Sequence, residues 1–218
     1  MEISIPGFTI LNGVSHSGKS TAIEYILHKY RKKIDYCIVF CNTCFTGKSF
    51  NFIPEKFVHN EYKEEVLINA MGIQSELVKQ RITKNLMIVF DDCLFDKQFT
   101  SPSFKKLITM YRHFNISILL STQFPNVLPP IFRANAFQVL IFQNTTHRAI
   151  QALYESYGQT FDTFNEFKSF MNKNTNNYQF IYINNREQEN TIEKKYKVCK
   201  ITKFPPKNWK LEFNTNLN

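Results

Sequence analysis

The chain has 218 residues, of which 43% are hydrophobic and 15% aromatic; this composition excludes a disordered protein and is sufficient for a sizeable core. The 27 Lys and Arg residues exceed the 18 Asp and Glu residues, which gives a formal net charge of +9. That charge suits a polyanionic partner but also fits a protein without one. No apolar run is long enough to cross a bilayer, so we expect no membrane association and no signal peptide. Five cysteines cannot all pair, which favours a reducing compartment.

Hydrophobic periodicity predicts the elements of the first half of the chain. In chain order we expect a strand at 8–11, a helix at 21–33, a strand at 36–41, a loop at 42–60, a helix at 61–84 that breaks near Gly72, and a strand at 86–90. The strands are continuous apolar runs rather than alternating ones. Such runs are typical of strands that are buried on both faces of a parallel sheet.

The second half of the chain continues this alternation of helices and strands. We expect a helix at 104–114, a strand at 116–120, a Pro-containing loop at 124–135, a strand at 137–142, and helices at about 146–157 and 162–172. Two segments of alternating polarity, 178–183 and 196–201, then predict a C-terminal β-hairpin. The sequence therefore predicts an α/β fold with a mostly parallel sheet, helices on both faces and the hairpin at the sheet edge. We expect a single domain over residues 1–218, with a core at about 5–160 and an appendage at about 161–210.

A glycine-rich motif follows the first predicted strand and precedes the first predicted helix. Residues 13–20 fit the P-loop pattern G-x-x-x-x-G-K-[ST]. In this motif successive backbone N–H groups and the helix N-terminus surround the phosphates of ATP. We expect Lys19 to reach the β- and γ-phosphates and Ser20 to ligate Mg²⁺. The predicted nucleotide-binding residues are Gly13, Val14, Ser15, His16, Ser17, Gly18, Lys19, Ser20 and Thr21.

Polar residues end the two following core strands. Asp91 and Asp92 close the strand at 86–90, and Gln123 follows the strand at 116–120. A carboxylate at such a strand end can hold Mg²⁺, and we assign this role to Asp91. Asp92 is then the candidate general base that polarises the attacking water. Gln123 is the candidate for orienting that water or sensing hydrolysis.

Two arginines are candidates for a residue donated to the active site of a neighbouring subunit. Arg133 and Arg148 flank the predicted strand at 137–142, and an arginine supplied in trans can stabilise the charge of the transition state. Each also fits a purely structural surface role. A second Gly-Lys-Ser triplet, Gly47 to Ser49, lacks the upstream glycine because Asn42 occupies that position, and we interpret it as an ordinary loop.

Three stretches together resemble the poxvirus-type genome-packaging ATPases of the FtsK–HerA superfamily. They are the glycine-rich loop at 13–20, the strand with its two aspartates at 86–92, and the Arg-His-x-x-Ile-Ser stretch that runs into Ser-Thr-Gln at 112–123. The glycine-rich loop is shared by all P-loop proteins, whereas the third stretch is much more specific. The resemblance extends over roughly residues 5–205.

The resemblance implies a RecA/FtsK-like ATPase that assembles as a homo-oligomeric ring and threads double-stranded DNA into a capsid. It implies that Lys19 and Ser20 bind ATP and Mg²⁺, that Asp91 serves the metal and that Gln123 senses the γ-phosphate. Asp92 stands where many members have Glu. For the arginine finger the first choice is Arg148 and the second Arg133. The resemblance further implies a capsid or portal-vertex partner, and a location in the host cytoplasm, the viral factory or the virion.

Two other functions remain open from the sequence. The first is a small P-loop nucleoside or nucleotide kinase, which would need an arginine-rich lid and an acceptor pocket. Against it, the basic residues are dispersed, and we expect another strand to separate the Asp-Asp strand from the P-loop strand. The second is a non-catalytic DNA-binding protein with a relic P-loop. For the packaging motor, the candidate contacts to DNA phosphates are Lys105, Lys106, Lys194, Lys195, Lys197, Lys200 and Lys203.

Overall fold

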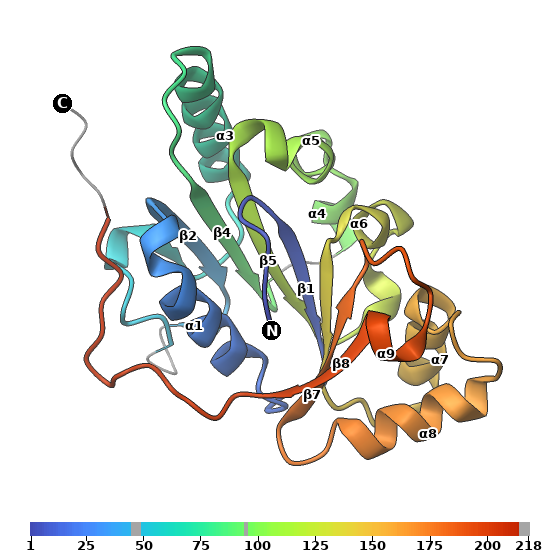
Figure 1. The fold of residues 1–218 in the computed structure, drawn as a ribbon. Coiled ribbons are helices and arrows are strands. Elements are labelled where there is room, and N and C mark those ends of the chain that lie inside the picture. Colours follow the sequence, from blue (N-terminus) through green and yellow to red (C-terminus); the bar gives the residue numbers. More distant parts are fainter. Residues whose placement is uncertain (45–48, 94–95, 214–218) are drawn as a thin grey trace.

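The computed structural model describes residues 1–44, 49–93 and 96–213, and within them an eight-stranded sheet has the order β3-β2-β4-β5-β1-β6-β7-β8 (Figure 1). Strands β1 to β6 are parallel, whereas β7 pairs antiparallel with β6 and with β8. The strands are β1 (Phe8–Asn12), β2 (Tyr36–Cys41), β3 (Val58–His59), β4 (Leu86–Asp91), β5 (Ile116–Thr122), β6 (Gln138–Ile141), β7 (Gln179–Asn184) and β8 (Tyr196–Lys200). The predicted α/β fold is confirmed, as is the C-terminal antiparallel pair at the sheet edge.

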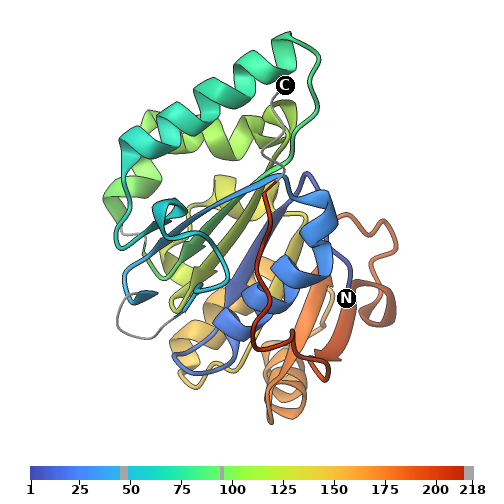
Figure 2. The ribbon, with the colours of Figure 1, turned by 90° about the vertical axis from the view of Figure 1, so that its left-hand side faces the viewer.

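Helices cover both faces of the sheet (Figures 1 and 2). They are α1 (Lys19–Tyr30), α3 (Glu64–Lys79), α4 (Asp96–Thr100), α5 (Pro102–Met110), α6 (Pro130–Asn135), α7 (His147–Tyr157), α8 (Phe164–Asn174) and α9 (Ile192–Lys195). One face packs against α1 and against Trp209 and Leu211 of the C-terminal segment. The opposite face packs against α3, α5, α6, α7 and α8.

Strand β4 shows why the core strands are continuously apolar. Its residues alternate between the two faces: Ile88 and Phe90 belong to one hydrophobic cluster, and Met87 and Val89 belong to the other. All four side chains are fully buried. Because both faces are covered by other elements, neither set of alternating positions tolerates polar residues. The first polar residue, Asp91, therefore marks the end of the strand.

Three sequence-based predictions of local structure were wrong. Helix α3 is continuous through Gly72, and a Cβ atom added to Gly72 would meet nothing within 4 Å. The burial of Leu67 and Met71 on the same helix offsets the cost of about 1 kcal/mol that a mid-helix glycine carries. The segment 42–60 includes the short strand β3, and the segment 124–135 includes the helix α6. Helix α6 has a proline at its first position, where the missing N–H costs nothing.

Helices α7 and α8, which precede the C-terminal hairpin, each begin at a residue whose side chain caps the helix N-terminus. The side chain of Thr146 accepts a hydrogen bond from the backbone N–H of Ala149 at the start of α7. Thr163 and Glu166 form a reciprocal capping box at the start of α8. Within the described ranges, no helix is both long enough and apolar enough to cross a membrane.

Candidate nucleotide-binding site

The glycine-rich loop lies between the end of β1 and the start of α1, and its glycines are required by the backbone. Gly18 has a φ of 105°, which is a left-handed conformation that glycine adopts without strain. A Cβ atom on Gly13 would lie 2.6 Å from Cβ of Phe142 and 2.7 Å from Oγ of Ser17. Both glycines of the motif are therefore needed for the loop to turn and to pack against Phe142, the residue that follows β6.

The loop is anchored by hydrogen bonds at its N-terminal end and presents backbone N–H groups at its C-terminal end. The N–H of Gly13 donates to the carbonyl of Thr122 (3.2 Å), and the N–H of Val14 donates to the carbonyl of Gln143 (3.0 Å). By contrast, no acceptor within the described part of the chain satisfies the N–H groups of residues 18–20. These donors stand at the positive end of α1, so the loop has the features of an anion-binding site.

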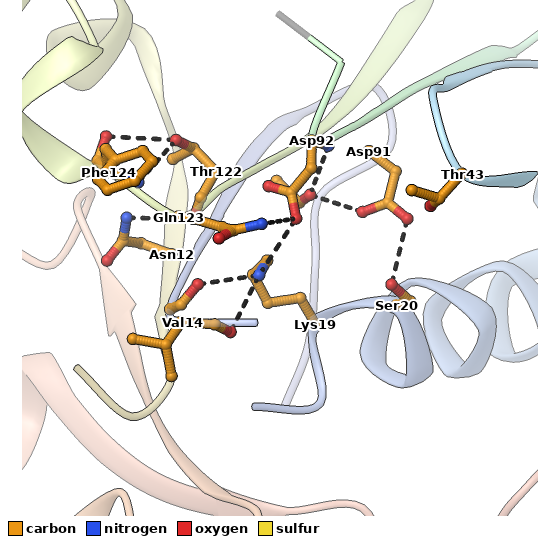
Figure 3. A network of polar contacts seen from close by, with 12 residues as sticks. Asn12, Val14, Lys19, Ser20, Thr43, Asp91, Asp92, Thr122, Gln123 and Phe124 are labelled. Carbon is orange, nitrogen blue, oxygen red and sulfur yellow. Dashed lines mark hydrogen bonds and ion pairs between the residues drawn. The ribbon is translucent and has the colours of Figure 1, made fainter. Parts of the chain in front are cut away.

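Lys19 is held at the centre of the site (Figure 3). Its ammonium group donates to the carbonyls of Gly13 (2.8 Å) and Val14 (3.2 Å), and it lies 3.3 Å from Oδ2 of Asp92. The side chain is only 4% exposed, yet it belongs to neither hydrophobic cluster. The cation is thus buried among oxygen atoms and positioned over the loop.

Asp91 is the buried carboxylate of the site. Its Oδ1 accepts a hydrogen bond from Oγ of Ser121 (2.6 Å), and its Oδ2 accepts one from Oγ of Ser20 (3.1 Å; Figure 3). Burial raises the pKa of the Asp91 carboxyl group, whereas these two hydrogen bonds and Lys19 oppose that rise. A carboxylate and a hydroxyl that lie this close are hard oxygen ligands, which fit Mg²⁺. The residues proposed for the metal therefore lie together.

Asp92 and Gln123 form the second polar pair. Nε2 of Gln123 donates to Oδ2 of Asp92 (3.2 Å), the same oxygen that faces Lys19. Asp92 has a φ of 47°, and its N–H donates to Oγ of Ser121 (3.0 Å). This left-handed turn directs Asp92 away from the Asp91 side of the strand end and toward Lys19. The structure thus brings Lys19, Ser20, Asp91, Asp92 and Gln123 together.

Sequence reasoning missed three polar residues that organise this edge of the sheet. Ser121 contacts both Asp91 and the backbone of Asp92. Nδ2 of Asn12 donates to the carbonyl of Thr122, and Nδ2 of Asn144 donates to Oδ1 of Asn12 (3.1 Å). The available signal was a polar residue at the end of a buried strand, since the carboxyl ends of parallel strands meet at one edge.

The two candidate arginines lie outside the polar network. Arg133, on α6, donates to Oγ of Ser156 (3.1 Å) on α7. Arg148, in the first turn of α7, is exposed, and among the described residues it has no hydrogen bond or ion pair. Neither contacts the site of its own chain. The second Gly-Lys-Ser triplet cannot be compared with its prediction, because residues 47 and 48 lie outside the described ranges.

Comparison with known sequences finds similar proteins in several viruses. It is 31% identical over 188 residues to protein 075L of invertebrate iridescent virus 6, covering 83% of this chain and 71% of that protein. The chain belongs to the family of protein 075L. The chain is also similar to protein L437 of Acanthamoeba polyphaga mimivirus, with 26% identity over 82% of this chain and 67% of that protein. No established protein-family model matches the sequence.

Comparison with solved structures identifies the fold. The structure of the genome packaging NTPase B204 from Sulfolobus turreted icosahedral virus 2 in complex with ATP-gammaS superposes with a TM-score of 0.66 at 16% identity, covering 91% of this chain and 98% of B204. The pCW3 conjugation coupling protein TcpA superposes with a TM-score of 0.60 at 12% identity, covering 84% of this chain and 58% of TcpA. The 075L-family chain therefore has the P-loop NTPase fold predicted from its sequence.

Proposed function

We propose that this protein is an ATP-hydrolysing motor that translocates double-stranded viral DNA into a preformed capsid. The observation that carries the proposal is the polar network itself. Lys19 and Gln123 both contact Oδ2 of Asp92, and Ser20 and Asp91 form a hydrogen-bonded pair beside them. Support also comes from the fold likeness to B204, which is described as a genome packaging NTPase. The poxvirus-type assignment within the FtsK–HerA superfamily is part of this proposal.

The chain's own residues divide the work of hydrolysis in this proposal. The N–H groups of residues 18–20 bind phosphate oxygens, and Lys19 exchanges its contact with Asp92 for one with the γ-phosphate. That exchange frees the Asp92 carboxylate to accept a proton from a water molecule, which Gln123 orients through its neighbouring amide. Ser20 and Asp91 would hold Mg²⁺, which when bound neutralises charge on the β- and γ-phosphate oxygens.

A second subunit completes the site in this proposal. Among the described residues, Lys19 is the one cation in ion-pair contact with the site's carboxylates. Positive charge on the far side of the γ-phosphate would come from an arginine donated in trans. We assign this role to Arg148 of a neighbouring subunit in a homo-oligomeric ring, because Arg148 is exposed and has no hydrogen bond or ion pair to any other described residue. Arg133 is the second choice, since Ser156 already accepts a hydrogen bond from it.

The strand order supports a motor over a small kinase, the alternative left open by the sequence. Strand β5 lies between β1, which leads into the P-loop, and β4, which ends in Asp91. This intervening strand places Gln123 next to Asp92 and so provides a residue that can orient water. A kinase must instead exclude water from the γ-phosphate and accept a second substrate.

The experiment that tests the function is an ATPase assay with and without linear duplex DNA. A translocating motor should hydrolyse ATP faster in the presence of DNA of any sequence, and the stimulation should fall steeply with salt because its contacts are to phosphates. Replacing the exposed Lys105 and Lys106 with Gln should reduce the salt dependence if α5 contacts DNA. Phosphate transfer to a nucleoside or nucleotide, with no effect of DNA, would instead identify a kinase.

The partners and location follow from the same proposal. A packaging motor acts at the capsid, so a capsid or portal-vertex protein is the expected docking partner. The corresponding location is the host cytoplasm, the viral factory or the virion.

A further inference from the structure

A cavity of about 520 Å³ adjoins the P-loop on the side of the C-terminal hairpin. It is lined by two of the predicted nucleotide-binding residues, Gly18 and Thr21, and by Phe142, Tyr178, Lys200, Ile201, Thr202 and Phe204. Its volume is in the range of pockets that hold small organic ligands. The hairpin thus forms, with the start of α1, a hollow that begins where the phosphate-binding loop ends.

Aromatic rings line this cavity. Phe142 is buried and stacks on Phe180 with ring centroids 4.9 Å apart. Tyr178 and Phe204, by contrast, are 70% and 67% exposed, which is unusual for rings of this size. Packing within the chain therefore does not account for the positions of Tyr178 and Phe204.

The backbone beside Tyr178 is strained. Asn177 and Tyr178 have φ values of 54° and 59°, a left-handed conformation that is unfavourable for a tyrosine. This turn carries the ring over the P-loop, where Cδ1 of Tyr178 lies 3.7 Å from the position that a Cβ atom on Gly18 would take. Strain that orients an exposed ring toward a ligand-binding loop points to a contact with the ligand.

The other wall of the cavity supplies free polar groups. Strand β8 ends at Lys200, and no hydrogen bond within the described residues involves the backbone groups of Ile201 or Thr202. An aromatic surface beside unpaired backbone donors and acceptors is the combination that recognises a flat heteroaromatic ring through its face and its edge.

We propose that this cavity binds the nucleobase of the nucleotide whose phosphates lie on the P-loop, with Tyr178 and Phe204 stacking on the base. The proposal rests on the proposed nucleotide-binding function and adds the residues that recognise the nucleoside. It gives the C-terminal hairpin a role in the site. Residues 178 and 204 lie far from the P-loop in the sequence, yet the fold brings them beside Gly18.

Calorimetric titrations of ADP and of inorganic tripolyphosphate, each with Mg²⁺, test the proposal. The variants are Tyr178→Gly, Tyr178→Phe and Phe204→Ala, with Ile73→Ala as the control, since Ile73 is 63% exposed on α3 and does not line the cavity. Glycine at position 178 removes the ring and tolerates the positive φ, so that variant is expected to fold. Circular dichroism checks the fold of each.

Loss of one stacking ring is expected to raise the Kd for ADP about tenfold in Tyr178→Gly and in Phe204→Ala. The Kd for tripolyphosphate should not change in either variant, and Tyr178→Phe and Ile73→Ala should bind ADP like the unmodified protein. Unchanged ADP affinity in both ring-deletion variants, with tripolyphosphate still bound, would overturn the nucleobase pocket and leave the P-loop function intact. Failure of the unmodified protein to bind either compound would overturn the proposed function, and the pocket with it.

Discussion

Ser121→Ala should weaken both the fold and the proposed metal site. Oγ of Ser121 donates to the buried Asp91 carboxylate at 2.6 Å and accepts from the N–H of Asp92 at 3.0 Å. Asp91 is 5% exposed, so water cannot readily replace the lost donor. A hydrogen bond to a charged group contributes about 1.5–3 kcal/mol. With the half-buried N–H of Asp92 also losing its acceptor, we expect the free energy of unfolding to fall by about 2–3 kcal/mol.

Strand β5 supplies a matched control. Ser117 is 2% exposed and lies four residues away, but its Oγ accepts one longer hydrogen bond, at 3.3 Å, from the neutral backbone N–H of Gly7. Ser117→Ala should therefore cost about 1 kcal/mol or less. Urea unfolding followed by circular dichroism measures both values. The Mg²⁺ concentration needed for half-maximal ATPase activity should rise for Ser121→Ala alone. Equal stability losses and equal Mg²⁺ requirements in the two variants would refute the assigned role of Ser121.

Three further predictions concern the same site. Lys19→Ala should lose nucleotide binding and turnover yet remain folded, because Lys19 belongs to neither hydrophobic cluster; normal turnover in the folded variant would contradict the site. Asp92→Asn should keep ADP bound but stop hydrolysis, because asparagine tolerates the φ of 47° while it cannot accept the proton; a steady-state assay showing near-normal turnover would exclude Asp92 as the base. Arg148→Ala should bind ATP normally and lose about 10³-fold or more in turnover. Mixing this variant with Lys19→Ala should restore some activity, because a mixed interface can pair an intact P-loop with an intact Arg148. A specific activity that is independent of protein concentration below any detectable association would contradict hydrolysis in trans.

The sequence was most informative where one physical requirement dominates. Strands buried on both faces must be apolar throughout, so β4 and its end at Asp91 could be predicted from residues 86–92 alone. The P-loop could be located because its turn and its close approach to Phe142 require glycines at positions 13 and 18. In both cases the constraint is local, and a linear pattern expresses it.

The sequence was least informative where the structure depends on pairing between distant segments. Ser121 faces Asp91 because β4 and β5 are parallel and in register at those two residues. The sequence of a single strand shows that it ends in a polar residue, but not which residue of the neighbouring strand it contacts. Strand β3 pairs with β2 through two residues, too few for a periodic pattern. Helix α3 continues through Gly72 because its apolar face packs against α5 and the turn at Tyr111–Phe114, a stabilisation that local propensity does not include.

The partners of the Lys19 ammonium group connect the stability of the site with the proposed hydrolysis. Its ammonium group is buried and is compensated by two carbonyls and by Asp92, so the folded chain already carries the positive charge at the point where phosphate is expected. An incoming γ-phosphate competes with Asp92 for that charge. As Lys19 turns to the phosphate, the Asp92 carboxylate loses its cation partner and is free to contact the attacking water. In this proposal a single exchange of partners both binds ATP and frees the Asp92 carboxylate for the water, which would link hydrolysis to a correctly seated γ-phosphate.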